Sequence, residues 1–350
     1  LTDYRIEEGK VVNDPGMAVP LKGKERTVCL SLKDGKQLWE HVVEVPYKLS
    51  YPGGPRATPT VIDGRVYALG GMGHLTCLDA ENGKVLWSHD LPAKYGGEVP
   101  IWGHSAQPLV VGDMVYCMVG GPGSAVMAFD AKSGKQAWKA IDAAKTSYAP
   151  LSLINLGQTD QLLAFTPWHL HSLDPASGKE YWKVKIRPDY DMSIMAPLES
   201  KGRVFVSGIG RKGLLVQVSD EGSPEAKVLW RSSPNEGVYC ANSTPVIVGD
   251  VLYGNDIRTS SLIAVDLKDG KRLWETRKPT LGEGKEGRVN HGTVYIVRHE
   301  GNGLFYLFNE QGDLIIAECT PGGYREISRA HILEPTNEAF GRPVVWSMPA

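Results

Sequence analysis

The sequence has little of what marks several common classes of protein. Its 350 residues contain no C-x-x-C motif and no adjacent cysteine pair, so they predict neither a zinc site nor a disulfide framework. Lysine and arginine do not gather into a basic block, and the formal net charge is −2, which argues against nucleic acid as a partner. No apolar run approaches the ~20 residues that a membrane-spanning helix needs. The five cysteines are expected to be reduced and mostly buried, and they are Cys29, Cys77, Cys117, Cys240 and Cys319.

Two motifs that often mark enzymes are missing in the required context. No G-x-S-x-G elbow is present, so nothing supports a serine hydrolase. No G-x-G-x-x-G stands between a predicted strand and a predicted helix, because helical patterns are nearly absent. The 40 glycines and the 42% hydrophobic content are typical of a turn-rich globular protein.

A pattern that ends in tryptophan recurs six times, as in LDAENGKVLW (78–87). Lysine stands three residues before the tryptophan in all six copies, and glycine stands four before it in five. The tryptophans are 48, 51, 44, 48 and 44 residues apart. Periods of about 40 to 50 residues built from strands predict a β-propeller with one four-stranded blade per repeat. The tryptophans are Trp39, Trp87, Trp138, Trp182, Trp230 and Trp274.

Each repeat has the pattern of one antiparallel blade. In TPTVIDGRVYALGG (58–71) an apolar strand, a tight D-G turn and a second strand follow one another, and a third strand, a glycine turn and a fourth strand ending in tryptophan come after them. We expect the glycine to take a positive φ, the preceding aspartate to accept hydrogen bonds from turn amides, and the tryptophan to fill the wedge between adjacent blades. The motif is therefore assigned to the scaffold. In the seventh repeat, Ile316 stands where the tryptophan is expected.

The pattern D-x-x-x-G-K-x-x-W, preceded by P-x-x-x-D-G-x-x-Y, resembles the PQQ-like β-propeller repeat family, which includes BamB-like and quinoprotein dehydrogenase-like propellers. The resemblance covers roughly residues 25–350 and implies an all-β propeller of four-stranded antiparallel blades. About seven complete blades and part of an eighth are expected in a single domain over 1–350, with both chain ends clipped. The repeats are placed at 1–43, 57–91, 105–141, 148–186, 194–233, 242–278, 288–333 and, in part, 342–350.

Residues just before the first strand of each repeat should converge at the mouth of the propeller channel, because the repeats are in register. Polar and aromatic residues dominate these positions. Arg56 suits carboxylates, His104 suits acid or base chemistry near neutral pH, and the aromatic residues suit stacking. The predicted ligand-binding residues are Arg56, Trp102, His104, Ser105, Tyr148, Asn242 and Trp346.

Two further segments are weaker candidates. WHLH (168–171) places His169 and His171 on one face of a strand, but no third metal ligand is evident, so an ordinary exposed face is the better interpretation. PDYDM (188–192) lacks the alternating oxygen ligands of a calcium loop and is interpreted as solvated charge. The sequence predicts no metal site.

Two functions remain open. The first is a binding or scaffold protein that holds a protein or a small ligand at the channel mouth, with loops such as 91–105 as the recognition surface. The alternative is a PQQ-dependent oxidoreductase acting on alcohols or sugars, with Ca²⁺, in which Arg56 pairs with the quinone carboxylates. The sequence assigns no catalytic base, no certain cofactor and no oligomeric state. The resemblance implies an exported protein, in the periplasm or the cell envelope.

Overall fold

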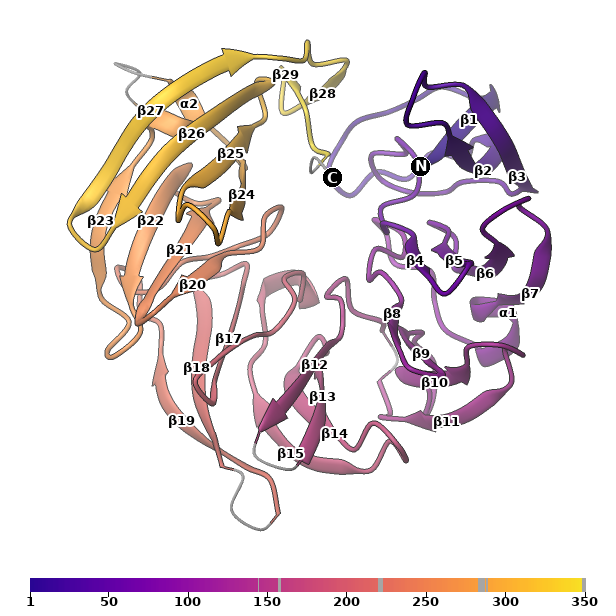
Figure 1. Ribbon diagram of the computed structural model, residues 1–350, viewed down its shortest axis with the longest axis horizontal. Coiled ribbons are helices and arrows are strands. Elements are labelled where there is room, and N and C mark those ends of the chain that lie inside the picture. The colour runs from indigo at the N-terminus through magenta and orange to yellow at the C-terminus, as the bar shows by residue number, and fades with distance from the viewer. Residues whose placement is uncertain (144, 157–158, 220–222, 283–286, 288, 348–350) are drawn as a thin grey trace. The chain divides into compact units, whose positions relative to one another are not determined.

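The computed structural model describes residues 1–143, 145–156, 159–219, 223–282, 287 and 289–347 (Figure 1). The chain forms two compact units. The first contains residues 1–155, 160–167 and 171–182, and the second contains 156–159, 168–170 and 183–350.

The strands of the first unit pair antiparallel with their neighbours in the chain. A three-stranded sheet precedes two four-stranded ones, and a short helix follows β7. The three-stranded sheet consists of β1 (Thr2–Glu8), β2 (Lys22–Leu30) and β3 (Gln37–Glu44). The next sheet consists of β4 (Thr60–Ile62), β5 (Arg65–Leu69), β6 (His74–Asp79) and β7 (Val85–Asp90), followed by α1 (Leu91–Tyr95). The third consists of β8 (Leu109–Val111), β9 (Met114–Met118), β10 (Val126–Asp130) and β11 (Gln136–Ala140).

Four further four-stranded sheets and a two-stranded sheet follow in the described residues, again with the strands of each sheet in chain order. The first of them consists of β12 (Ser152–Leu156), β13 (Thr159–Phe165), β14 (His169–Leu173) and β15 (Glu180–Lys185), followed by a 3-10 turn at Asp189–Asp191. The second consists of β16 (Leu198–Ser200), β17 (Arg203–Gly208), β18 (Lys212–Ser219) and β19 (Glu225–Arg231). The third consists of β20 (Val246–Val248), β21 (Val251–Asp256), β22 (Ser261–Asp266) and β23 (Arg272–Thr276), followed by α2 (Lys278–Leu281). The last two consist of β24 (Val294–Arg298), β25 (Phe305–Asn309), β26 (Asp313–Thr320) and β27 (Gly323–His331), and of β28 (Asn337–Ala339) and β29 (Arg342–Val344).

The repeated glycine turn has the predicted conformation. Gly83 has φ 74° and Gly134 has φ 68°, and the carboxylate of Asp79 accepts hydrogen bonds from the amides of Glu81 and Asn82. The glycine has a second role that the sequence did not reveal. A Cβ at Gly134 would lie 2.6 Å from the ring of Trp87, so the turn packs directly against the tryptophan of the preceding repeat.

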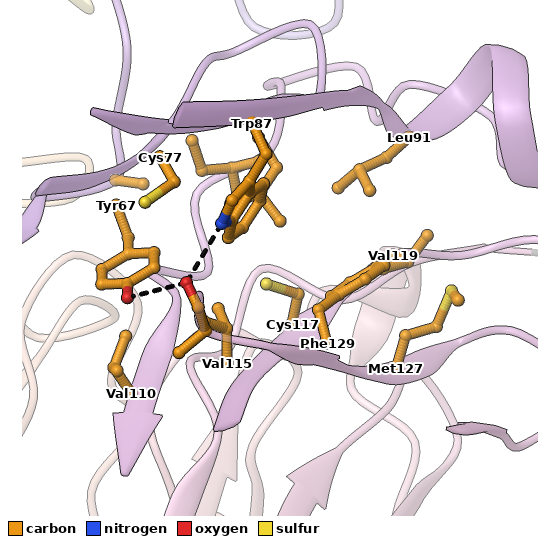
Figure 2. Packing of buried hydrophobic residues seen from close by; sticks show 14 residues of the cluster. Tyr67, Cys77, Trp87, Leu91, Val110, Val115, Cys117, Val119, Met127 and Phe129 are labelled. Carbon is orange, nitrogen blue, oxygen red and sulfur yellow. Dashed lines mark hydrogen bonds between the residues drawn. The ribbon is translucent and has the colours of Figure 1, made fainter. Parts of the chain in front are cut away.

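Four of the repeat tryptophans also meet the aromatic residue of the second strand in their own sheet. The rings of Tyr67 and Trp87 lie 5.9 Å apart, and the Tyr67 hydroxyl and the Trp87 indole N–H both donate to the carbonyl of Ala131, over 3.1 and 3.0 Å. Figure 2 shows the two donors meeting at one oxygen. The same pairing recurs for Tyr116 and Trp138 on the carbonyl of Pro175. The motif thus joins consecutive sheets within a unit.

The core follows from burial of the two middle strands of each sheet. Residues of β5, β6, β9 and β10 are almost continuously apolar and buried, because both faces of these strands are covered. In the cluster of Figure 2, Cys77, Cys117, Met127 and Phe129 are fully buried. Burial raises the pKa of the Cys117 thiol to about 12, so this cysteine is an inert thiol, as expected.

The prediction for Ile316 is wrong. Ile316 lies on the third strand of its sheet, β26, and pairs with Ser328 on β27. In the other sheets a bulge interrupts the pairing of the third and fourth strands just before the tryptophan, as between Cys77 and Leu78 opposite Trp87. The equivalent bulge near Ala317 puts Ser328 at the tryptophan position. The error arose because this repeat lacks the D-x-x-x-G-K turn that fixes the register elsewhere.

Candidate functional site

Arg56 braces the loop that leads into β4. Its guanidinium donates to three backbone carbonyls, those of Ser50 at 2.9 Å, Tyr51 at 2.5 Å and Gly54 at 2.5 Å. Tyr51 has φ 50°, a left-handed conformation that costs a residue with a side chain on the order of 1 kcal/mol, and the arginine holds it in place. Burial lowers the pKa of Arg56, with the charges of Tyr47 and Glu25 opposing this effect. The side chain expected to bind carboxylates is therefore engaged by its own loop.

Trp102, Ser105 and Tyr148 come together beside this loop. The rings of Trp102 and Tyr148 meet edge to face with centroids 5.9 Å apart, and the Ser105 hydroxyl donates to the Tyr148 carbonyl over 3.1 Å. The amide of Ser50 donates to the carbonyl of Ile101, which ties the Arg56 loop to the Trp102 loop. Burial raises the pKa of the Tyr148 phenol to about 12, so the phenol is neutral at physiological pH. These residues contact one another and present aromatic faces.

His104 lies beneath these residues and is 2% exposed. Its backbone N–H donates to the carbonyl of Gly71 over 2.8 Å, and its Nε2 has no hydrogen-bond partner among the described residues. Burial and, to a smaller extent, the nearby His74 lower the pKa of His104 to about 4. The imidazole is neutral at pH 7, so it does not fit the expected role as an acid or base near neutrality.

Glu25 and Tyr47 complete the cluster, and the sequence analysis missed both. Glu25 is 6% exposed, and its Oε1 accepts hydrogen bonds from the Tyr47 hydroxyl and, over 2.6 Å, from the Gly71 amide. Tyr4 stacks on Tyr47 with ring planes 6° apart. The signal in the sequence was a glutamate at an inward position of the alternating strand KGKERTVCL, where an apolar residue is expected.

The other two predicted residues, Asn242 and Trp346, lie in the second unit and belong to one group of contacts. The Asn242 amide donates to the Thr293 hydroxyl over 3.1 Å, which in turn donates to the carbonyl of His291. The rings of His291 and Phe340 stack 5.3 Å apart, and Phe340 packs on Trp346. Both stacked residues have left-handed backbones, with φ of 56° and 51°. The seven predicted residues thus form two groups, one in each unit.

Buried charge supports the second group. Glu310 is 2% exposed and forms a two-pronged ion pair with Arg342, with both contacts at 3.0 Å. The Trp346 indole donates to the same carboxylate over 3.3 Å. The Glu310 carboxylate is therefore held by contacts within the protein, as the Arg56 guanidinium is in the first group.

The weaker candidates have structural partners. His171 is buried rather than exposed, which corrects the expectation for WHLH, and its Nδ1 lies 2.7 Å from the Glu180 carboxylate. The Asp191 carboxylate accepts from Arg187 and from the Trp168 indole, so it is paired rather than solvated. In the described part of the chain, no three His, Cys, Asp or Glu side chains gather as metal ligands. No helix among the described residues is long and apolar enough to cross a membrane.

Replacing Arg56 by alanine should loosen the first of these loops. The variant loses three hydrogen bonds from a charged donor, so we expect it to lower the free energy of unfolding by about 2 kcal/mol and to speed amide exchange in residues 50–56. Urea denaturation and hydrogen exchange measure the two effects. Arg5→Ala, at an exposed position on β1, is the control and should stay within about 0.5 kcal/mol of the parent. Equal effects of the two substitutions would contradict the bracing role.

Four-stranded antiparallel sheets in chain order, several of which contact the next sheet through a tryptophan and a glycine turn, define a β-propeller of PQQ-like repeats. The chain belongs to the family described as outer membrane protein assembly factor BamB, which matches residues 23–275 and 168–347.

One solved structure shares this fold, and two others show lower similarity. BamB from Moraxella catarrhalis is 14% identical, with a TM-score of 0.59 over 95% of this chain and 92% of that one. A computationally designed protein, Ika8, is 11% identical with a TM-score of 0.45, over 79% of this chain and 88% of that one. A europium-containing methanol dehydrogenase is 12% identical with a TM-score of 0.42, over 90% and 85% of the two chains. No curated protein matches the chain in sequence. The all-β propeller expected from the repeats is confirmed.

Proposed function

We propose that this chain is an exported binding protein of the cell envelope that holds a protein partner on the surface formed by loops 50–56 and 96–105 together with Tyr148. The family is described as an outer membrane protein assembly factor, which supports a protein partner and an envelope location. The proposed function involves no catalytic step.

The observation that carries the proposal is the internal use of the polar groups in this cluster. The Arg56 guanidinium donates to backbone carbonyls, and the Ser105 hydroxyl donates to the carbonyl of Tyr148. His104 is buried and neutral. What remains for a ligand is a set of half-buried aromatic faces, chiefly Trp102, on a frame that is already ordered. Rigid aromatic anchors of this kind dominate the binding energy of protein interfaces, because little conformational entropy is lost when they are covered.

The quinoprotein alternative would require the same residues to give up contacts that they make in the structure. Arg56 would have to leave the carbonyls of Ser50, Tyr51 and Gly54 in order to pair with quinone carboxylates. The buried carboxylate nearest to it in the cluster, Glu25, is held by Tyr47 and the Gly71 amide. The described residues therefore do not offer a ready site for PQQ and Ca²⁺.

Truncation of Trp102 tests the proposal. Affinity-tagged full-length protein is purified from its native envelope, and the amount of each co-purifying protein is compared between the parent and Trp102→Ala. Loss of a central aromatic anchor costs about 2 kcal/mol or more, so the main partner should fall at least about tenfold. Leu32→Ala removes a fully exposed side chain in the turn between β2 and β3 and should leave the yield unchanged. An unchanged yield with Trp102→Ala would contradict the proposal.

A further inference from the structure

The loop that carries Trp102 is fastened by few bonds and hinged at two glycines. Residues 96–105 contain no strand or helix, and Gly96 and Gly103 both have φ 74°. Three hydrogen bonds fasten it to neighbouring segments: the His104 amide donates to the carbonyl of Gly71, the Ser50 amide to the carbonyl of Ile101, and the Ser105 hydroxyl to the carbonyl of Tyr148. A Cβ at Gly103 would lie 2.8 Å from the Gly71 oxygen, so the closed position depends on tight packing at that point. Such a segment can open locally without unfolding the sheets.

The side chain at the centre of this closure is His104, whose Nε2 has no hydrogen-bond partner among the described residues. His104 Nε2 faces the backbone of Gly73, where a Cβ would lie 2.9 Å away, and the ring of Pro92 on α1 lies beside the same glycine. The first turn of α1 carries no acidic residue. From β6 the ring is faced by His74, which lies 3.6 Å from Asp90 and which disfavours a positive charge on His104. The carboxylate of Glu25 on β2 is already committed to Tyr47 and the Gly71 amide.

The cavity found beside His74 does not extend to the imidazole of His104. The cavity beside His74 has a volume of about 20 Å³, which is room for one water molecule, and its walls include Glu25, Thr76 and His74. His104 is not among the residues that line it. A proton on His104 Nε2 would be buried without a hydrogen-bond acceptor among the described residues, so protonation disfavours the closed loop.

We propose that His104 makes the loop 96–105 a pH-operated latch, closed while the imidazole is neutral and opened when protonation draws the imidazole into water. This inference rests on the proposed function in one respect only, namely that opening moves Trp102 and so releases the partner. The latch itself is a property of the chain and is measured without a partner.

The direction of the pH response follows from the pKa of His104, which is about 4 when the loop is closed and near 6.5 when the ring is in water. A depressed pKa in the closed form means that closure is fully stable above pH 6.5 and weakens as the pH falls toward 4. Between pH 7.5 and pH 5 the opening equilibrium should rise about 30-fold.

Hydrogen exchange of the full chain tests the latch. After correction for the intrinsic pH dependence of exchange, peptides covering 96–105 should show about 30-fold more opening at pH 5 than at pH 7.5, while the β5 and β6 peptides stay protected. His104→Gln should abolish this difference, and His104→Met serves as a second variant without a titrating group should the glutamine impair folding. His299→Gln, at an exposed position in the second unit, should respond like the parent. A parent without the pH response, or a glutamine variant that keeps it, would overturn the proposal.

Failure of the latch and failure of the proposed function are distinguishable. Partner yield from Trp102→Ala at pH 7.5 reports binding alone, and loop exchange in the purified chain reports the latch alone. A pH response without any partner overturns only the binding role.

Discussion

Replacing Asp256 by alanine is expected to lower the free energy of unfolding of the second unit by about 4 kcal/mol. Asp256 is fully buried, and its carboxylate accepts a 2.6 Å contact from Arg272, whose side chain is 13% exposed. The other carboxylate oxygen accepts from the amides of Arg258 and Thr259. Alanine leaves the buried guanidinium short of a counter-charge and two amides without an acceptor, and both effects destabilise the fold.

Asp269 provides the matched control in the same sheet. It also forms an ion pair, at 2.7 Å from Lys271, but its side chain is 39% exposed and that of Lys271 is 70% exposed. Water replaces such a pair readily, so Asp269→Ala should cost less than about 1 kcal/mol. Urea denaturation of both variants measures the difference. A cost for Asp256→Ala no larger than that for Asp269→Ala would show that the buried pair does not hold the sheet together.

The second large effect is expected at the repeated glycine. Gly134→Ala forces a residue with a side chain into φ 68° and sets its Cβ 2.6 Å from the ring of Trp87. The left-handed backbone costs about 1 kcal/mol, and displacing the buried indole costs about 2 kcal/mol more. We therefore expect a loss of about 3 kcal/mol.

Gly35 separates the two contributions, because it occupies the same position in the first repeat. Its φ is 70°, and a Cβ there would meet nothing within 4 Å. Gly35→Ala should thus cost only the backbone term of about 1 kcal/mol. Thermal or urea unfolding of both variants, followed by circular dichroism, provides the comparison. Equal losses would mean that the glycine is required for its φ alone and not for the contact with tryptophan.

The repeats predicted the fold well because they encode it several times over. Six tryptophans at a period near 47 residues, five of them with a turn glycine, specify antiparallel four-stranded sheets more firmly than any single strand does. The prediction failed at Ile316, where the turn motif is absent and the bulge that sets the register leaves no mark on the sequence. The packing of Gly134 on Trp87 was also hidden, because it joins residues of different repeats.

The sequence predicted which residues of the first unit lie near one another in the candidate site, but not the roles of their polar side chains. Register alone placed Trp102, Ser105 and Tyr148 together, and the structure brings them into contact. The roles of Arg56 and His104 depend on the atoms that surround them, which the sequence does not show. Backbone carbonyls surround the Arg56 guanidinium, and His104 Nε2 has no hydrogen-bond partner among the described residues. Glu25 was missed for the same reason, since a glutamate in a strand is normally assigned to the solvent side.

Photo-crosslinking from position 102 in the native envelope tests most directly whether this surface holds a protein. A photoreactive benzoylphenylalanine in place of Trp102 should give one discrete adduct with the mass of the chain plus a single partner, and the same group in place of Leu32 should give none. The absence of an adduct from position 102, together with calcium-dependent micromolar binding of PQQ that Arg56→Ala abolishes, would contradict the binding role and support the oxidoreductase.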